Sequence, residues 1–232
     1  MMEKPGGSLS RSSSTEERKV NNFFELSGRK LNGDTVRFER FRGKVVLVEN
    51  IASLADFTRR ELNQMNDLAR IFKNDLVILG YPCNQFGYQE NTEAGELLNM
   101  FKHVRPGKGF KPQFTIMYKV EVNGYRTNSV YRYLKSRLPI PRGEDEDSRM
   151  VLGDPKILTW MPVCRNDLSG NFEKFLIDRE GQPYARYGPQ IPTIALKDDI
   201  DRLLTSEALS EVPSADDACP YYIVSQEMST RK

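Results

Sequence analysis

The sequence predicts an α/β fold in which a central mixed sheet is flanked by helices and preceded by an N-terminal β-hairpin. Three observations predict it. Two short apolar runs, at residues 45–48 and 76–79, have the length of buried strands. Between them, apolar residues recur at helical spacing. Further along, residues 175–178 and 184–187 are strand-like segments separated by Arg179-Glu-Gly-Gln182, as in an antiparallel hairpin.

One domain is expected, because 232 residues with 38% hydrophobic content suit a single ordinary core. We place it at residues 21–204. Residues 1–20 are rich in Ser and charge and offer little apolar surface to offset the entropy of ordering. We therefore expect a disordered leader at residues 1–20 and a flexible tail at residues 205–232.

The N-terminal hairpin is predicted from two apolar segments, residues 23–26 and 35–38. They flank Ser27-Gly28 and Asn32-Gly33, which are turn-forming pairs. The first core strand is then expected at residues 44–49.

The helix after that strand is expected to begin near Thr58, because Thr58-Arg59-Arg60-Glu61 has the pattern of a capping box. Its core-facing stripe follows the spacings 3, 4 and 3 and consists of Leu62, Met65, Ala69 and Phe72. With the strand at 76–79 it forms a βαβ unit, whose crossover is almost always right-handed.

The remaining elements alternate in the same way. We predict helices at 93–102 and 129–137, a strand at 114–120 and a last helix that residues 200–204 close, with loops at 106–112 and 139–154. The first of these helices carries Ala94, Leu97, Leu98 and Phe101 on one side. Strand–helix–strand, then helix, then hairpin and helix is the order of a thioredoxin-like sheet.

The composition excludes several function classes. Lys and Arg outnumber Asp and Glu by only 34 to 32, which gives no electrostatic reason to expect nucleic acid as a partner. No apolar run approaches the roughly 20 residues of a membrane span. Residues 1–20 contain no apolar core of a secretory signal. We therefore expect a cytoplasmic protein.

The three cysteines, Cys83, Cys164 and Cys219, make an odd count at unrelated spacings. That argues against a disulfide framework and a zinc site, so no metal and no cofactor are predicted. We expect Cys83 and Cys164 to be buried thiols beside the core, and Cys219 to be exposed in the tail.

The loop between the first core strand and its helix has the features of an anion site. Free N–H groups at the helix start and the positive end of the helix dipole should point towards Ala55. A sulfur or selenium anion there would be stabilised and reactive at neutral pH. Ala55, however, carries only a methyl group.

Four segments carry a dense family resemblance. They are Glu49-Asn-Ile-Ala-Ser-Leu54, Leu79-Gly-Tyr-Pro-Cys-Asn-Gln-Phe-Gly-Tyr-Gln-Glu-Asn91, Val104-Arg-Pro-Gly107 and Asn171-Phe-Glu-Lys-Phe-Leu176. Together they closely resemble the glutathione peroxidases over roughly residues 20–204. The resemblance implies a thioredoxin-like fold and reduction of hydrogen peroxide and organic hydroperoxides by glutathione or another thiol, through a selenocysteine or cysteine nucleophile.

Carried over residue by residue, the resemblance places the nucleophile at Ala55 and the family's glutamine at Gln89. The family's tryptophan position is Gly170, and the asparagine after it is Asn171. A methyl group cannot attack an O–O bond or be regenerated by thiols. Turnover is therefore expected to be absent or severely reduced, either because a selenocysteine was substituted or because the chain is a natural pseudoenzyme. A purely structural role for Gln89 and Asn171 is the alternative at those two positions.

The resemblance also suggests partners. Arg60 and Arg105 match positions that contact glutathione in the tetrameric cytosolic type, whereas Pro189 and Gln190 replace a further basic pair. The loops at 106–112 and 139–154 resemble those of tetrameric members, so a homotetramer is expected. Two alternative functions stay open: a non-catalytic thiol-binding or regulatory module, and a weak peroxidase acting through Cys83.

Overall fold

The core of the molecule is a five-stranded mixed sheet in the order β5-β4-β3-β6-β7. The computed structural model describes residues 20–142 and 158–205. The strands are β3 (Val45–Ile51), β4 (Leu76–Pro82), β5 (Thr115–Ile116), β6 (Lys174–Ile177) and β7 (Pro183–Tyr187). β3 runs parallel to β4 and antiparallel to β6, which confirms the predicted mixed sheet. All seven residues of β3 are buried: the apolar run at 45–48 predicts this for its own residues, and Glu49 and Asn50 are buried as well.

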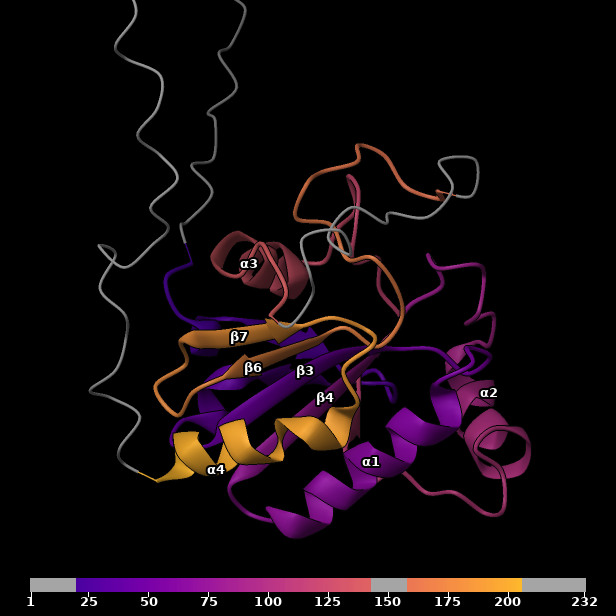
Figure 1. The fold of residues 1–232 in the computed structure, drawn as a ribbon. Helices are drawn as coiled ribbons and strands as arrows, with labels where there is room; N and C mark the ends of the chain where they lie inside the picture. The colour runs from indigo at the N-terminus through magenta and orange to yellow at the C-terminus, as the bar shows by residue number, and fades with distance from the viewer. Residues whose placement is uncertain (1–19, 143–157, 206–232) are drawn as a thin grey trace, which may run out of the picture.

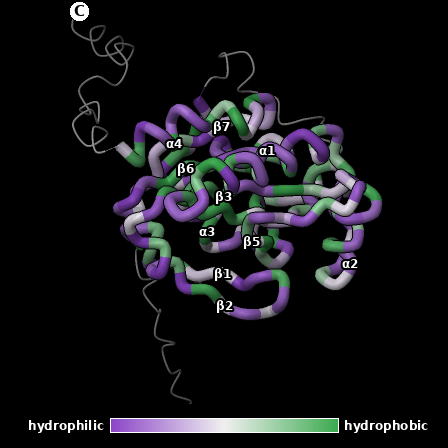
Figure 2. Tube along the Cα trace, turned by 90° about the horizontal axis from the view of Figure 1, so that it is seen from below, coloured by the Kyte–Doolittle hydropathy of each residue, from purple (hydrophilic) through white to green (hydrophobic). Residues whose placement is uncertain are grey.

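Alternate residues of β3 face two different cores. Val45 and Leu47 pack with α1 (Thr58–Ile71) and α4 (Lys197–Leu204). Val46 and Val48 pack instead with α3 (Ser129–Arg137). Figure 1 shows α1 and α4 on one side of the sheet and α3 on the other. The central strands are the most hydrophobic part of the trace, with polar segments around them (Figure 2).

The N-terminal hairpin is present but starts later than predicted. Its strands are β1 (Ser27–Arg29) and β2 (Thr35–Arg37), and they pair antiparallel. Phe23–Glu25 forms a 3-10 helix (η1), because the Asn22 side chain accepts a hydrogen bond from the Phe24 N–H at 2.9 Å and starts a turn. A second 3-10 helix, η2 (Phe38–Phe41), follows the hairpin.

The predicted strand at 114–120 is wrong beyond its first residues. After β5, Met117 N–H donates to Gly80 O of β4, while Tyr118 N–H donates to Arg29 O of the hairpin. A regular parallel ladder would next bond residue 119 to β4, but Val120 N–H donates to Pro82 O at 3.0 Å instead, so no regular ladder continues.

The predicted helix at 93–102 is also divided. It consists of α2 (Ala94–Asn99) and a π-helical turn, η3 (Met100–Val104). Leu97 and Phe101 are buried as expected, but Leu98 is 49% exposed. The last helix, α4, ends at Leu204 as predicted, and η6 (Thr193–Leu196) leads directly into its start.

Several predictions fall on residues that the structure does not describe. These are the leader at 1–20 apart from Val20, most of the loop at 139–154, and the tail at 205–232 apart from Thr205. None of the helices within residues 20–142 and 158–205 is long and apolar enough to cross a bilayer.

Candidate functional site

The loop that contains Ala55 is held at the carboxyl end of β3 by the segment that follows β4. Leu54 N–H donates to Gln89 O at 2.9 Å. The Glu90 carboxylate accepts from Ser53 N–H at 2.8 Å and from the Ser53 hydroxyl at 3.2 Å. Ala55 itself is only 4% exposed and packs in the same core as Phe172. The predicted nucleophile position is therefore next to the predicted glutamine segment.

Gln89 and Asn171 meet directly, although they are far apart in sequence. Asn171 Nδ2 donates to Gln89 Oε1 at 2.8 Å. Asn171 is buried, and its Oδ1 atom has no hydrogen-bond partner. A buried acceptor without a donor is costly, so this amide pair has an unused hydrogen-bonding capacity beside the loop.

Asn50, near the end of β3, holds the third segment of the candidate site, residues 170–173. Its Nδ2 atom donates to Gly170 O at 2.9 Å, and its Oδ1 atom accepts from Glu173 N–H at 2.9 Å. Phe172 N–H donates to Asn50 O at 2.7 Å. The end of β3 thus holds both the Ala55 loop and the 170–173 turn, and the four predicted site positions gather there.

The predicted capping box at Thr58 and Glu61 is wrong. The Thr58 hydroxyl donates backwards to Ala52 O at 2.7 Å and to Ala55 O at 2.8 Å. Thr58 N–H also donates to Ala55 O, at 3.2 Å. These contacts hold the loop closed against α1, but they also use a backbone donor that was expected to be free for an anion.

The two arginines predicted to contact a ligand are bound to the protein itself. Arg105 Nη1 donates to Leu54 O at 3.1 Å and to Ala55 O at 3.3 Å. Arg60 Nε donates to Glu61 Oε1 at 2.5 Å, and its guanidinium lies 4.4 Å from the centre of the Phe57 ring. Both cations therefore help to shape the loop and the first turn of α1.

A buried charged cluster behind the loop was not predicted. Lys174 Nζ lies 3.3 Å from Glu61 Oε2, and both side chains are fully buried. The Thr193 hydroxyl contacts the carboxylates of both Glu61 and Glu49, at 2.5 and 3.0 Å. Burial raises the pKa of Glu49 to about 8 against the attraction of Lys174, and the nearby Glu61 adds to the shift. Glu49 directly follows the apolar run of β3 and Lys174 directly precedes that of β6, which was the sequence signal for this cluster.

The two described cysteines, Cys83 and Cys164, differ in their exposure to solvent. Cys83 is buried as predicted, and burial raises the pKa of its thiol to about 12. The expectation of a buried Cys164 is wrong, because this thiol is exposed. Both are free thiols. Cys219 lies outside the described residues.

The chain's single tryptophan does not replace the one expected at position 170. Trp160 Nε1 donates to Asp167 Oδ2 at 2.9 Å, and the ring packs edge-on against Phe86. At Gly170, a Cβ atom would lie 3.3 Å from Pro189 Cγ. Within residues 20–142 and 158–205, no group of three or more His, Cys, Asp or Glu side chains is arranged to hold a metal ion.

Comparisons with known proteins agree on one family. A sequence profile described as "Glutathione peroxidase" matches residues 23–135. Glutathione peroxidase 2 of Sapajus apella is 50% identical over 182 residues, which cover 78% of this chain and 94% of the relative. Glutathione peroxidase 2 of Homo sapiens is 49% identical over 182 residues, which again cover 78% of this chain and 94% of the relative.

Solved structures agree with the fold. "Crystal structure of Trgpx in apo form" aligns with a TM-score of 0.54 and 27% identity, over 80% of this chain and 97% of that one. "Crystal structure of T. cruzi GPX1" aligns with a TM-score of 0.53 and 24% identity, over 79% of this chain and 97% of that one. This second match is evidence for the fold alone. The predicted thioredoxin-like fold is confirmed.

Proposed function

This chain belongs to the glutathione peroxidase family, and from that premise we propose that it is a pseudoenzyme of the family. The family reaction is the reduction of hydroperoxides by glutathione. We infer that the chain keeps the scaffold of this reaction but that its turnover is absent or severely reduced. One observation supports the proposal: Leu54, which precedes the position that the resemblance gives to the nucleophile, donates to Gln89 O, and the Gln89 side chain accepts from Asn171.

The chemistry explains why this one position matters. Peroxide reduction needs a polarisable anion that attacks one oxygen of the O–O bond and is later regenerated by thiols. A methyl group has no lone pair and no ionisable proton at any pH. The amides of Gln89 and Asn171 can assist a nucleophile by hydrogen bonding, but they cannot replace one.

Gly170 supports the proposal as a second loss. An indole N–H at this position would donate to a developing anion, and removal of one such donor costs about 10²–10³ in rate at comparable sites. Trp160 does not compensate, since its N–H is bound to Asp167. The effect of Gly170 is secondary to that of Ala55.

The two alternatives have weaker support. A non-catalytic thiol-binding or regulatory module would use Arg60 and Arg105, but both guanidinium groups already bind the protein. A weak peroxidase through Cys83 would need a thiolate, and a pKa of about 12 leaves almost none at neutral pH.

The experiment is a glutathione-dependent assay of the full chain with hydrogen peroxide and with a lipid hydroperoxide. Glutathione peroxidase 2 of Homo sapiens serves as the active reference. We expect rates indistinguishable from the uncatalysed reaction. Turnover within about tenfold of the reference, a difference of only about 1.4 kcal/mol in activation free energy, would contradict the proposal.

We also propose a homotetramer in the cytoplasm. The 106–112 loop, which resembles that of tetrameric members, supports the assembly. The free thiols of Cys83 and Cys164 suit a reducing compartment. Sedimentation velocity of the full chain tests the first proposal, and fractionation of expressing cells tests the second.

A further inference from the structure

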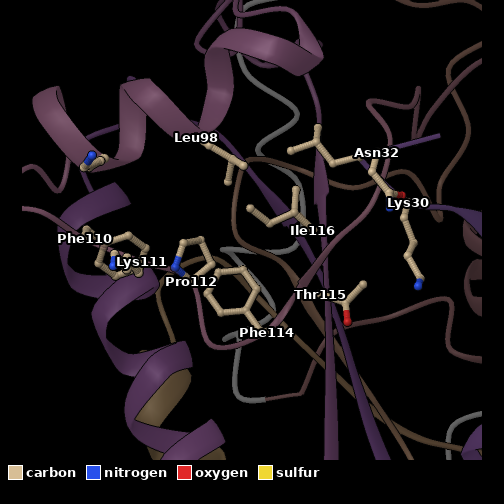
Figure 3. A pocket seen from close by; sticks show the side chains of 11 residues that line it. Lys30, Asn32, Leu98, Phe110, Lys111, Pro112, Phe114, Thr115 and Ile116 are labelled. Carbon is tan, nitrogen blue, oxygen red and sulfur yellow. The ribbon is translucent and has the colours of Figure 1, made fainter. Parts of the chain in front are cut away.

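A cavity of about 440 Å³ lies apart from the Ala55 loop, between α2, the turn of the N-terminal hairpin and the segment that leads into β5. None of its lining residues is one of the predicted site positions. Figure 3 shows Leu98 of α2 directed towards Ile116 of β5, with Phe110, Pro112 and Phe114 forming the neighbouring wall. Its volume is in the range of small-molecule pockets.

The walls of the cavity are apolar, and part of this surface is open to solvent. Leu98 is 49% exposed, and Phe110 and Phe114 are half-buried. Exposed apolar surface that lines a hollow is typical of a binding site. Six lining side chains are apolar: Leu31, Leu98, Phe110, Pro112, Phe114 and Ile116.

Hydrogen bonds from outside the cavity hold these walls in place. Asn66 of α1 donates to Lys111 O at 2.9 Å and accepts from Gln113 N–H at 2.7 Å. Leu31 N–H donates to Ile116 O at 3.0 Å, which joins the hairpin turn to β5. The Phe110 ring packs edge-on against Phe101. A ligand therefore meets a largely pre-formed site and spends little free energy on ordering it.

The charge around the cavity has one sign. Three lysines line it, Lys30, Lys102 and Lys111, and no Asp or Glu does. Within the described part of the chain, none of the three forms an ion pair. Lys30 and Lys111 lie at opposite sides of the cavity in Figure 3. An apolar hollow with an uncompensated cationic rim suits a ligand with an apolar body and an anionic head.

We propose that this cavity binds a long-chain carboxylate, with the alkyl chain against Leu98, Phe114 and Ile116 and the carboxylate at the lysine-lined rim. Binding of the alkyl chain removes apolar surface from water on both partners, and the positive potential of the rim favours an anionic head over a neutral or cationic one. A second copy of this chain is the competing occupant, because Phe110, Lys111 and Pro112 belong to the 106–112 loop that supports the proposed tetramer. A two-fold contact of this surface with itself would bring lysines towards lysines, which favours the carboxylate.

The test is calorimetry of the full chain with dodecanoate below its micelle concentration. We expect saturable binding of one molecule per chain. The variant with Lys30→Gln, Lys102→Gln and Lys111→Gln should bind at least about tenfold more weakly. Its matched control, Lys44→Gln with Lys73→Gln and Lys197→Gln, removes the same charge elsewhere and should bind like the unmodified chain. Dodecyltrimethylammonium, which has the same tail and the opposite charge, should bind at least about tenfold more weakly than dodecanoate.

A second variant tests the apolar wall. Leu98→Asp adds a carboxylate to the cavity, and because Leu98 is exposed in α2 the fold should survive, as circular dichroism will check. Dodecanoate binding should fall by at least about tenfold. The proposal is overturned if dodecanoate does not bind, if both lysine variants bind it equally, or if Leu98→Asp has no effect. A last outcome would also overturn it. If the unmodified chain forms an assembly that does not bind dodecanoate, and Leu98→Asp dissociates that assembly, then the cavity is a contact between subunits.

Discussion

At the scale of single residues, the environment of each thiol decides what it can do. Cys83 is buried, and its Sγ atom lies 3.8 Å from Gln85 Oε1, whereas Cys164 is exposed. Reaction with peroxide needs an accessible thiolate. We therefore expect peroxide treatment followed by sulfenic-acid labelling to modify Cys164 and not Cys83. A Cys219→Ser background removes the tail thiol from the measurement. Mass spectrometry that finds labelled Cys83 in folded protein would restore the Cys83 peroxidase hypothesis.

The raised pKa of Glu49 predicts how the free energy of unfolding depends on pH. Its pKa is raised to about 8 in the folded state from an ordinary value of 4.5, chiefly by burial. The folded state therefore binds this proton more tightly than the unfolded state. The contribution of Glu49 to stability is full below about pH 4.5 and is lost as pH rises to about 8.

Glu49→Gln tests this dependence, because the amide resembles the protonated carboxyl. The free energy of unfolding of the unmodified chain, minus that of the variant, should fall between about pH 5 and about pH 8. Urea denaturation at each pH measures it. A difference that stays constant over this interval would mean that Glu49 is ionised in the fold throughout.

At the scale of elements, Arg105 joins η3 to the loop after β3. It donates to the carbonyls of Leu54 and Ala55. Hydrogen bonds from a charged group contribute about 1.5–3 kcal/mol, so Arg105→Met should lower the free energy of unfolding by about that amount. Arg126→Met is the control, because Arg126 pairs with Glu121 at the exposed surface and such pairs contribute about 0–1 kcal/mol. Equal urea midpoints for the two variants would show that Arg105 does not hold the loop.

Element positions were predictable where apolar periodicity decides them. β3, α1, β4 and α3 lie where their apolar patterns place them, because burial on one or both faces selects these residues. The start of α1 was predicted correctly but for the wrong reason. Thr58 and Glu61 match a capping box locally, yet the fold offers them the carbonyls of Ala52 and Ala55 and the hydroxyl of Thr193. Local sequence does not reveal tertiary partners.

The same limit applies to the candidate site. Ala55, Gln89, Gly170 and Asn171 were selected by family resemblance, and the structure adds the hydrogen bonds that bring their segments together. The cluster of Glu49, Lys174 and Thr193 was not predicted, because its members lie on three separate elements. No spacing within one segment marks such a cluster.

At the scale of the whole molecule, one buried arginine joins four segments. Arg186 of β7 pairs with Glu173 at 2.7 Å and donates to the carbonyls of Pro139, Asn166 and Asp167. Removing one partner of a buried ion pair costs about 3–5 kcal/mol, because the other charge stays buried. Arg186→Met should therefore lower the free energy of unfolding by about that amount, measured by urea denaturation against Arg126→Met. A loss no greater than that of the control would show that these contacts are weak.

The central claim concerns Ala55, and restoring a nucleophile there tests it most directly. The measurement is the initial rate of glutathione-dependent hydrogen peroxide reduction by the unmodified chain, by Ala55→Cys, and by Ala55→Cys with Gly170→Trp. We expect no turnover in the first and measurable turnover in the second. The third should be faster by at least about tenfold, because an indole donor is added, provided that Pro189 shifts to admit the ring. Turnover by the unmodified chain, or none in either folded variant, would contradict the account.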